Sequence, residues 1–189
     1  MLISKNIEDN VYQKIQEIEI KYNIILSQDY KNFLIKYNGG ETPKTNFRNK
    51  KVNTDIRRFY GFTKENNNSD LLSVIENGLG EELILEGRLP IATNSFGDYF
   101  LIRVSEEKNG EISFIFHDSV QSECIIASDF RGFLKLCKSE KMGYIRSIEE
   151  RKQSFIDAGK GDKITQIKID SWQKEIDKYA GMCQEEVIL

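Results

Sequence analysis

The chain has 189 residues, of which 39% are hydrophobic and 11% aromatic, a composition that suits one folded core and excludes global disorder. Its first residues are polar and it contains no run of about 18 apolar residues, so we expect a cytoplasmic protein without membrane contact. The net charge is −3, but residues 61–138 carry 7 Lys or Arg against 13 Asp or Glu. That middle segment excludes a basic stripe for nucleic acid and favours attraction of a basic partner, with solvated surface charge as the alternative.

The amino-terminal part predicts two amphipathic helices. Spacings of three and four place one apolar face on a first helix, formed by Ile7, Val11, Ile15, Ile18 and Tyr22. Ser27 is expected to cap a second helix, which Asn38-Gly39-Gly40 would end in a left-handed conformation. The apolar face of this second helix consists of Tyr30, Phe33, Leu34 and Tyr37.

The next segment alternates between loop and regular structure. Residues 41–53 are polar and contain Pro43, so we expect a loop there with at most a short strand near Phe47. Residues 55–62 are richer in apolar and aromatic side chains and predict a strand. Helical spacing then begins at Leu71 and is weakened by Gly78 and Gly80.

The middle of the chain predicts an antiparallel meander. Four β-rich runs follow one another at residues 89–93, 99–104, 112–117 and 123–127. They are separated by short turns, and Asn109-Gly110 is a strong hairpin signal. Ser128 is expected to cap a closing helix. Helices at both ends of consecutive strands place the protein in the α+β class.

Beyond Lys141 the pattern changes to a helical extension, so we expect a domain at residues 1–140 and an extension at 141–189. Residues 147–158 predict a helix stopped by Gly159. A second helix carries an apolar stripe formed by Ile169, Trp172, Ile176 and Tyr179. We expect this stripe to pack on the domain, because an exposed stripe of this kind is costly; burial against a partner is the alternative.

No pattern in the sequence indicates catalysis. His117 is the single histidine, no serine lies in a Gly-x-Ser-x-Gly motif, and the three cysteines Cys124, Cys137 and Cys183 are scattered. These residues predict reduced thiols, no metal site, no cofactor and no enzymatic activity. Residues 159–162 have the composition of a phosphate loop but not its spacing, so we expect a turn between helices.

Five motifs in order resemble the Smi/Knr branch of the SUKH superfamily over about residues 5–138. They are Ser27 to Leu34 followed by Tyr37-Asn38-Gly39-Gly40; Phe59-Tyr60-Gly61-Phe62; Leu89-Pro90-Ile91-Ala92 with Gly97 to Leu101; His117-Asp118; and Ala127 to Phe130 with Phe133-Leu134. The resemblance implies an α+β fold with a mixed, mostly antiparallel curved sheet flanked by helices. The family often has proline where Ser27 stands, and either residue suits a helix start.

The resemblance also implies a protein-binding role without catalytic residues. Bacterial members look like immunity proteins encoded beside polymorphic secreted toxins, often nucleases, whereas fungal members regulate cell-wall synthesis through protein contacts. We therefore expect an antitoxin whose partner is a cognate toxin, with a regulatory or scaffold module that binds an endogenous protein as the alternative. The candidate partner-binding residues are Tyr60, Glu81, Glu82, Glu86, Asp98, His117 and Asp118.

Overall fold

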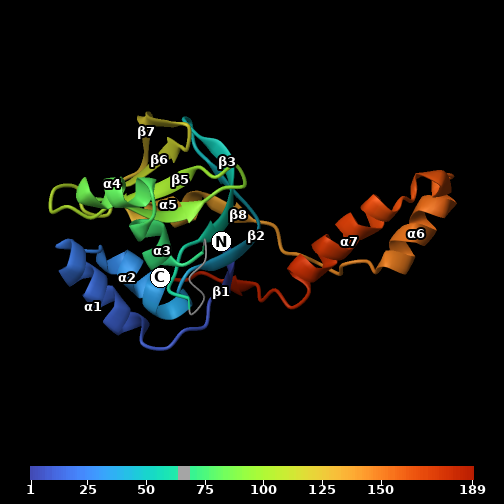
Figure 1. The fold of residues 1–189 in the computed structure, drawn as a ribbon, viewed down its shortest axis with the longest axis horizontal. Coiled ribbons are helices and arrows are strands. Elements are labelled where there is room, and N and C mark those ends of the chain that lie inside the picture. The colour runs from blue at the N-terminus through green and yellow to red at the C-terminus, as the bar shows by residue number, and fades with distance from the viewer. Residues whose placement is uncertain (64–68) are drawn as a thin grey trace. The chain divides into compact units, whose positions relative to one another are not determined.

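A computed structural model describes residues 1–63 and 69–189 and divides the chain into two compact units (Figure 1). The first unit contains residues Met1–Glu140 and Gln184–Leu189. The second unit contains residues Lys141–Cys183. The last six residues therefore return to the first unit, and the sequence analysis did not separate them from the extension.

The first unit is built on one open antiparallel sheet. Its strands, as far as the chain is described, are β1 (Leu2–Lys5), β2 (Gly40–Arg48), β3 (Asn53–Phe59), β4 (Arg88–Thr93), β5 (Tyr99–Arg103), β6 (Ile112–Phe116), β7 (Ser119–Ala127), β8 (Cys137–Ser139) and β9 (Glu185–Glu186). The order is β7-β6-β5-β4-β3-β2-β1-β9, and β8 also pairs with β2. Every pairing between these strands is antiparallel, which confirms the predicted meander from β4 to β7 and the α+β class.

Strand β2 occupies the segment that the sequence analysis expected to be mainly a loop. Thr45 and Phe47 are buried while their neighbours Lys44, Asn46 and Arg48 are exposed, the alternation of a half-buried strand. Pro43 lies where the register between β2 and β3 shifts, and such an irregularity accommodates a residue that has no N–H to donate. The expectation of a loop was wrong because polar side chains fill the outward positions and conceal the alternation.

The helices of the first unit are α1 (Val11–Tyr22), α2 (Gln28–Tyr37), α3 (Leu71–Glu76), α4 (Leu79–Leu85) and α5 (Phe130–Leu136). Ile7 is 91% exposed and lies outside α1, because Asn10 takes a left-handed conformation just before the helix begins. Asn38 ends α2 at a φ of 51°, as predicted. The cap of α5 is Asp129 rather than Ser128, since the Asp129 carboxylate accepts a hydrogen bond from the Gly132 N–H at 2.6 Å.

Aromatic rings from helices and strands fill the core of the first unit. Phe33 of α2 lies 5.2 Å from both Phe59 of β3 and Phe130 of α5, measured between ring centroids. Phe133 of α5 lies 5.4 Å from Phe47 and completes the contact between helices and sheet. All five rings are at most 1% exposed, and each such burial contributes about 1.5–3 kcal/mol. The predicted apolar face of the second helix, to which Phe33 belongs, thus points into the core.

The carboxyl-terminal segment forms the edge strand β9 of the sheet. Leu2 and Ile3 of β1 pair with Glu186 and Glu185. The Tyr37 hydroxyl of α2 donates to the Glu186 carbonyl oxygen at 3.2 Å and accepts from the Ile188 N–H at 2.9 Å. These bonds join the carboxyl-terminal segment to α2 on one side and to β1 on the other.

The second unit is a helical hairpin formed by α6 (Ile148–Asp157), a short 3-10 turn (Gly161–Lys163) and α7 (Gln166–Tyr179). Ser147 and Glu150 form a capping box at the start of α6. Phe155 and Trp172 meet edge to face at 5.3 Å, and Arg151 pairs with Glu175 at 2.8 Å. The four residues of the predicted stripe on α7 are half-buried.

Candidate protein-binding surface

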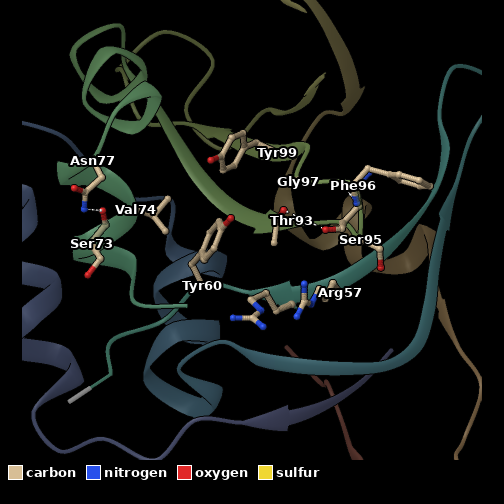
Figure 2. A pocket seen from close by; sticks show the side chains of 12 residues that line it. Arg57, Tyr60, Ser73, Val74, Asn77, Thr93, Ser95, Phe96, Gly97 and Tyr99 are labelled. Carbon is tan, nitrogen blue, oxygen red and sulfur yellow. Dashed lines mark hydrogen bonds between the residues drawn. The ribbon is translucent and has the colours of Figure 1, made fainter. Parts of the chain in front are cut away.

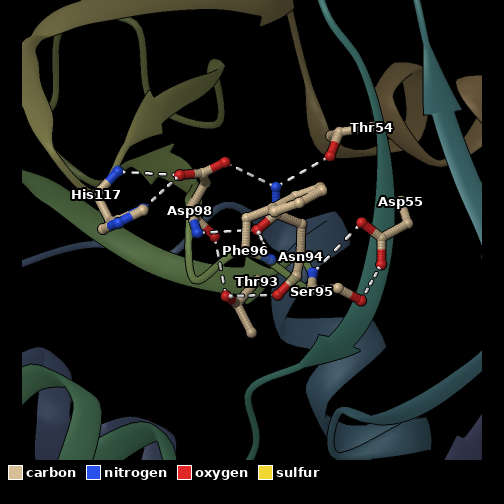
Figure 3. Close-up of polar contacts among 8 residues, drawn as sticks. All are labelled: Thr54, Asp55, Thr93, Asn94, Ser95, Phe96, Asp98 and His117. Carbon is tan, nitrogen blue, oxygen red and sulfur yellow. Dashed lines mark hydrogen bonds and ion pairs between the residues drawn. The ribbon is translucent and has the colours of Figure 1, made fainter.

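The turn between β4 and β5 is held by an asparagine whose side chain bonds in four directions. Asn94 is 2% exposed, and its Oδ1 accepts hydrogen bonds from the N–H groups of Phe96 at 3.0 Å and Asp98 at 2.9 Å. Its Nδ2 donates to Asp98 Oδ2 at 2.8 Å and to Thr54 Oγ1 at 3.0 Å (Figure 3). Because the amide is satisfied within the protein, the shape of the turn is fixed before any partner arrives.

Asp98 connects this turn to the end of β6. Its Oδ1 accepts hydrogen bonds from the N–H of His117 at 3.1 Å and from Nδ1 of the same residue at 2.9 Å. Burial opposes ionisation of Asp98, but the hydrogen bonds from His117 and Asn94 outweigh it and hold the pKa of Asp98 below its usual value. The hydrogen bond to Asp98 raises the pKa of His117. The imidazole is therefore an anchored, half-exposed side chain.

Phe96 stands at the tip of the turn and is 73% exposed. The residue after it, Gly97, has a φ of 89°, a backbone conformation that glycine adopts without steric cost. On the other side, Ser95 donates hydrogen bonds from its N–H and hydroxyl to the Asp55 carboxylate of β3. The turn thus exposes a large aromatic side chain to solvent. Hydrogen bonds to Asn94 and Asp55 fix the backbone that carries it.

Two hollows adjoin Phe96. The first, which we call the arginine pocket, has a volume of about 600 Å³ and lies between β3, α3 and the turn (Figure 2). Its lining includes Arg57, Arg58, Tyr60, Asn77, Phe96 and Tyr99. The second, the histidine pocket, has a volume of about 500 Å³, and its lining includes Lys51, Phe96, Phe114, Phe116, His117 and Asp118. Phe96 therefore separates two concave surfaces, one positively charged and one of mixed character.

The structure brings together four of the seven candidate residues around this turn. Asp98, His117 and Asp118 line the histidine pocket, and Tyr60 lines the arginine pocket. Tyr60 is 3% exposed, burial raises the pKa of its hydroxyl, and its ring lies 6.5 Å from that of Tyr99.

The three glutamates lie elsewhere. Glu81 and Glu82 are exposed in the first turn of α4 and line neither of the two pockets. Glu86 follows α4 and forms an ion pair with Arg88, which also pairs with Glu123 at 3.1 Å. The acidic middle of the chain is thus partly neutralised by its own arginines, and Glu81 and Glu82 retain more free charge than Glu86.

A local close approach positions Tyr60. The Asn38 side chain at the end of α2 bonds to both the N–H and the carbonyl oxygen of Phe62 at 2.7 Å. A side chain at Gly61 would overlap the carbonyl oxygen of Asn38. Glycine is therefore required beside Tyr60, and the Phe59-Tyr60-Gly61-Phe62 motif has a structural reason.

Sequence reasoning missed Phe96, Arg57 and Arg58. The signal for Phe96 was an aromatic residue inside a Ser-Phe-Gly-Asp turn, where small and polar residues are usual. The two arginines gave no signal because their pocket forms from segments far apart in the sequence.

Among the described residues, no group of three His, Cys, Asp or Glu side chains is arranged to hold a metal ion. The cysteines of the described chain form no disulfide, and burial raises the pKa of the Cys137 thiol. No described helix is long and apolar enough to cross a membrane.

One protein-family model matches the chain. The family SUKH_6, described as SMI1-KNR4 cell-wall, matches residues 12–134, which run from α1 to α5 and include the β4–β5 turn with both pockets. The match ends before the helical hairpin of the second unit. No curated protein matches the chain.

Proposed function

Because the chain belongs to the SUKH_6 (SMI1-KNR4 cell-wall) family, we propose that it is a cytoplasmic immunity protein. It neutralises a cognate polymorphic secreted toxin, a nuclease, by direct binding and without catalysis. The observation that carries this proposal is the rigid turn that holds Phe96 in water between two pockets. We define the β4–β5 surface as Phe96 together with the arginine and histidine pockets.

A fixed, exposed aromatic side chain is typical of the anchor of a protein interface. Truncating such anchors costs 2 kcal/mol or more in many interfaces, and they lie beside pockets from which water is excluded on binding. Fixing the backbone beforehand lowers the entropy lost on association. Phe96 on its hydrogen-bonded turn meets both conditions.

The geometry around His117 supports a binding role over a catalytic one. Its Nδ1 is engaged by Asp98, as an orienting carboxylate would engage a general base. No Ser, Thr or Cys side chain of the described chain forms a hydrogen bond with this imidazole, so the nucleophile of a triad is lacking there. Asp98 instead serves to join the turn to β6.

Charge supports a basic toxin. The chain carries a net charge of −3, and the exposed Glu81 and Glu82 belong to its acidic middle. Such a surface accelerates association with a basic nuclease domain more than it strengthens the final complex.

The test begins with the gene beside the one that encodes this chain. If it encodes a large secreted protein with a carboxy-terminal toxin domain, that domain and this chain are expected to co-purify, and this chain should restore growth of cells that express the toxin. Phe96→Ala should weaken the complex by about 30-fold or more, that is, about 2 kcal/mol. Ile7→Ala, which removes an even more exposed apolar side chain outside the surface, should leave affinity unchanged.

Failure to bind or protect against the neighbouring toxin would contradict the proposal. Co-purification with an endogenous protein of the cell in place of the toxin would favour the regulatory alternative. Equal losses in Phe96→Ala and Ile7→Ala would place the interface outside the β4–β5 surface.

A further inference from the structure

The arginine pocket carries unbalanced positive charge within an acidic protein. Arg57 is exposed and has no ion pair with any described residue, whereas Arg58 pairs with Glu41 at 2.6 Å. No Asp or Glu is among the described residues that line the pocket. The pocket therefore presents one guanidinium that the described chain does not neutralise.

The second arginine is only partly satisfied. Nε of Arg58 is buried and has no hydrogen-bond partner in the described chain, although its Nη2 is bonded to Glu41. A buried donor without a partner is costly, and a guanidinium can serve a carboxylate with two parallel N–H groups. Arg58 therefore adds positive charge beside the exposed guanidinium of Arg57, and this charge favours an incoming acceptor that is negatively charged.

The remaining lining suits an amino-acid side chain with an apolar stem. Figure 2 shows Tyr60 and Tyr99 beside the hollow, with Ser73 and Asn77 of α3 across from Arg57. The two tyrosine rings are tilted by 40° to each other and contribute aromatic surface to the lining. A volume of about 600 Å³ holds more than a lone carboxylate, and accommodates a side chain with part of its backbone.

The same geometry disfavours phosphate. Phosphate sites are commonly made by backbone N–H groups at the start of a helix. Here α3 contributes Ser73, Val74 and its final capping residue Asn77, and the N–H of Ser73 in the first turn already donates to Asp70 Oδ2 at 2.9 Å. A singly charged carboxylate suits this environment better than a doubly charged phosphate.

We propose that the arginine pocket binds an Asp or Glu side chain of the partner protein, with its carboxylate on the exposed guanidinium of Arg57 and next to the charge of Arg58. That this side chain comes from a partner protein rests on the proposed function, because the arginine pocket is part of the β4–β5 surface. The pocket then fixes the register of the complex, while the acidic exterior affects the rate of encounter.

The proposal can be tested without the toxin, by following the arginine Nε–Hε signals in NMR spectra at constant ionic strength. The probes are N-acetyl-glutamate N-methylamide, its glutamine analogue and inorganic phosphate. We expect saturable shifts of the Arg57 and Arg58 signals with the glutamate probe only. Arg57→Gln should weaken this binding by about tenfold, the loss typical of a charge-assisted contact. Arg48→Gln, which removes an exposed arginine on β2 outside both pockets, should leave it unchanged.

Equal shifts with the glutamine analogue, or none with the glutamate probe, would overturn the proposal. Tighter binding of phosphate would also overturn it, by identifying the pocket as a site for a free anion. Backbone amide spectra of both variants verify that the fold is intact. Since no arm of this experiment contains the toxin, its outcome is independent of whether the chain neutralises one.

Discussion

Asn94 is the residue on which the shape of the β4–β5 turn depends most. Asn94→Ala removes four side-chain hydrogen bonds, two of them to backbone N–H groups in the turn. We expect a loss of about 2–4 kcal/mol in the free energy of unfolding, because buried groups lose their partners. Urea denaturation measures it, with Asn46→Ala on the exposed face of β2 as the control. A loss no larger than that of the control would show that the turn does not depend on this amide.

The His117 and Asp98 pair gives stability a defined pH dependence. The pKa of His117 is raised above 6.5, so its contribution is complete below that value and is lost as pH rises through the folded pKa. The pKa of Asp98 is lowered below 3.8, so its contribution is present above that value and is lost as pH falls through the folded pKa. The pair therefore stabilises most between about pH 4 and 6.5.

His117→Ala should remove the part of this dependence that occurs as the pH rises above 6.5. Urea midpoints are expected to fall as the pH rises from about 6.5 to about 8, the range in which histidine side chains titrate. The fall should be larger in the natural chain than in the variant. An identical profile in both proteins would contradict the assigned coupling. The backbone bond from residue 117 to Asp98 remains in the variant, so the turn itself should persist.

At the scale of elements, the Tyr37 hydroxyl of α2 is one of the contacts that hold the edge strand β9, beside its pairing with β1 and the bond from Lys36 to the Ile188 carbonyl oxygen. Tyr37→Phe removes the bonds to Glu186 and Ile188 while keeping the buried ring. We expect a destabilisation of about 1–3 kcal/mol in urea denaturation, with faster amide exchange in residues 185–188. Tyr12→Phe serves as the control, since Tyr12 is 59% exposed. Unchanged exchange in residues 185–188 would show that β9 is held without the Tyr37 hydroxyl, by its pairing with β1 and its remaining side-chain contacts.

The acidic first turn of α4 should influence how fast the toxin is captured. Glu81→Lys with Glu82→Lys is expected to slow association in stopped-flow experiments at low salt, and the difference should shrink as salt rises, since screening acts over about 8–10 Å. Glu149→Lys with Asp170→Lys makes the same charge change in the second unit. Glu185 is a poor control because it pairs with Lys5 at 3.0 Å. Salt-independent association rates would show that the acidic residues of α4 are solvated surface charge and do not guide association.

Local patterns predicted the elements whose signals lie within one segment. The apolar spacing of α1 and α2, the left-handed stop at Asn38 and the short turns of the meander all appear in the structure. Strands β2 and β9 were missed because each forms by pairing with a strand that is distant or not recognisable from its own sequence. In β2, Pro43 also argued against a strand. Helix α5 was predicted but its cap was displaced by one residue, since Ser128 and Asp129 are both good caps.

The candidate surface was predictable only in part, for the same reason. Asp98, His117 and Asp118 were selected because turns and strand ends can present side chains to a partner, and they do line one pocket. The arginine pocket needs β3, α3 and the β4–β5 turn to meet, a juxtaposition that no local pattern encodes. Its charge is also opposite to the net charge of −3 of the whole chain, so the overall composition gave no signal for it.

For the whole molecule, the two units suggest a division of roles. The helical hairpin has its own internal contacts, including the pair Phe155 and Trp172, and lies outside the family match. Replacing residues 141–183 with a Gly/Ser linker should leave the sheet unit folded and able to bind the toxin. Circular dichroism and toxin titration check this outcome. Loss of binding in a folded variant would assign part of the interface to the hairpin.

The central claim is that the β4–β5 surface meets the partner, and hydroxyl-radical footprinting of the complex tests it most directly. The side chain of Phe96 is 73% exposed in the free protein, and that of Tyr144 in the second unit is 80% exposed, so both should be oxidised readily. On addition of the toxin domain, Phe96 is predicted to become protected while Tyr144 keeps its rate of oxidation. Unchanged oxidation of Phe96 in a saturated complex, with protection appearing at Tyr144, would contradict the account.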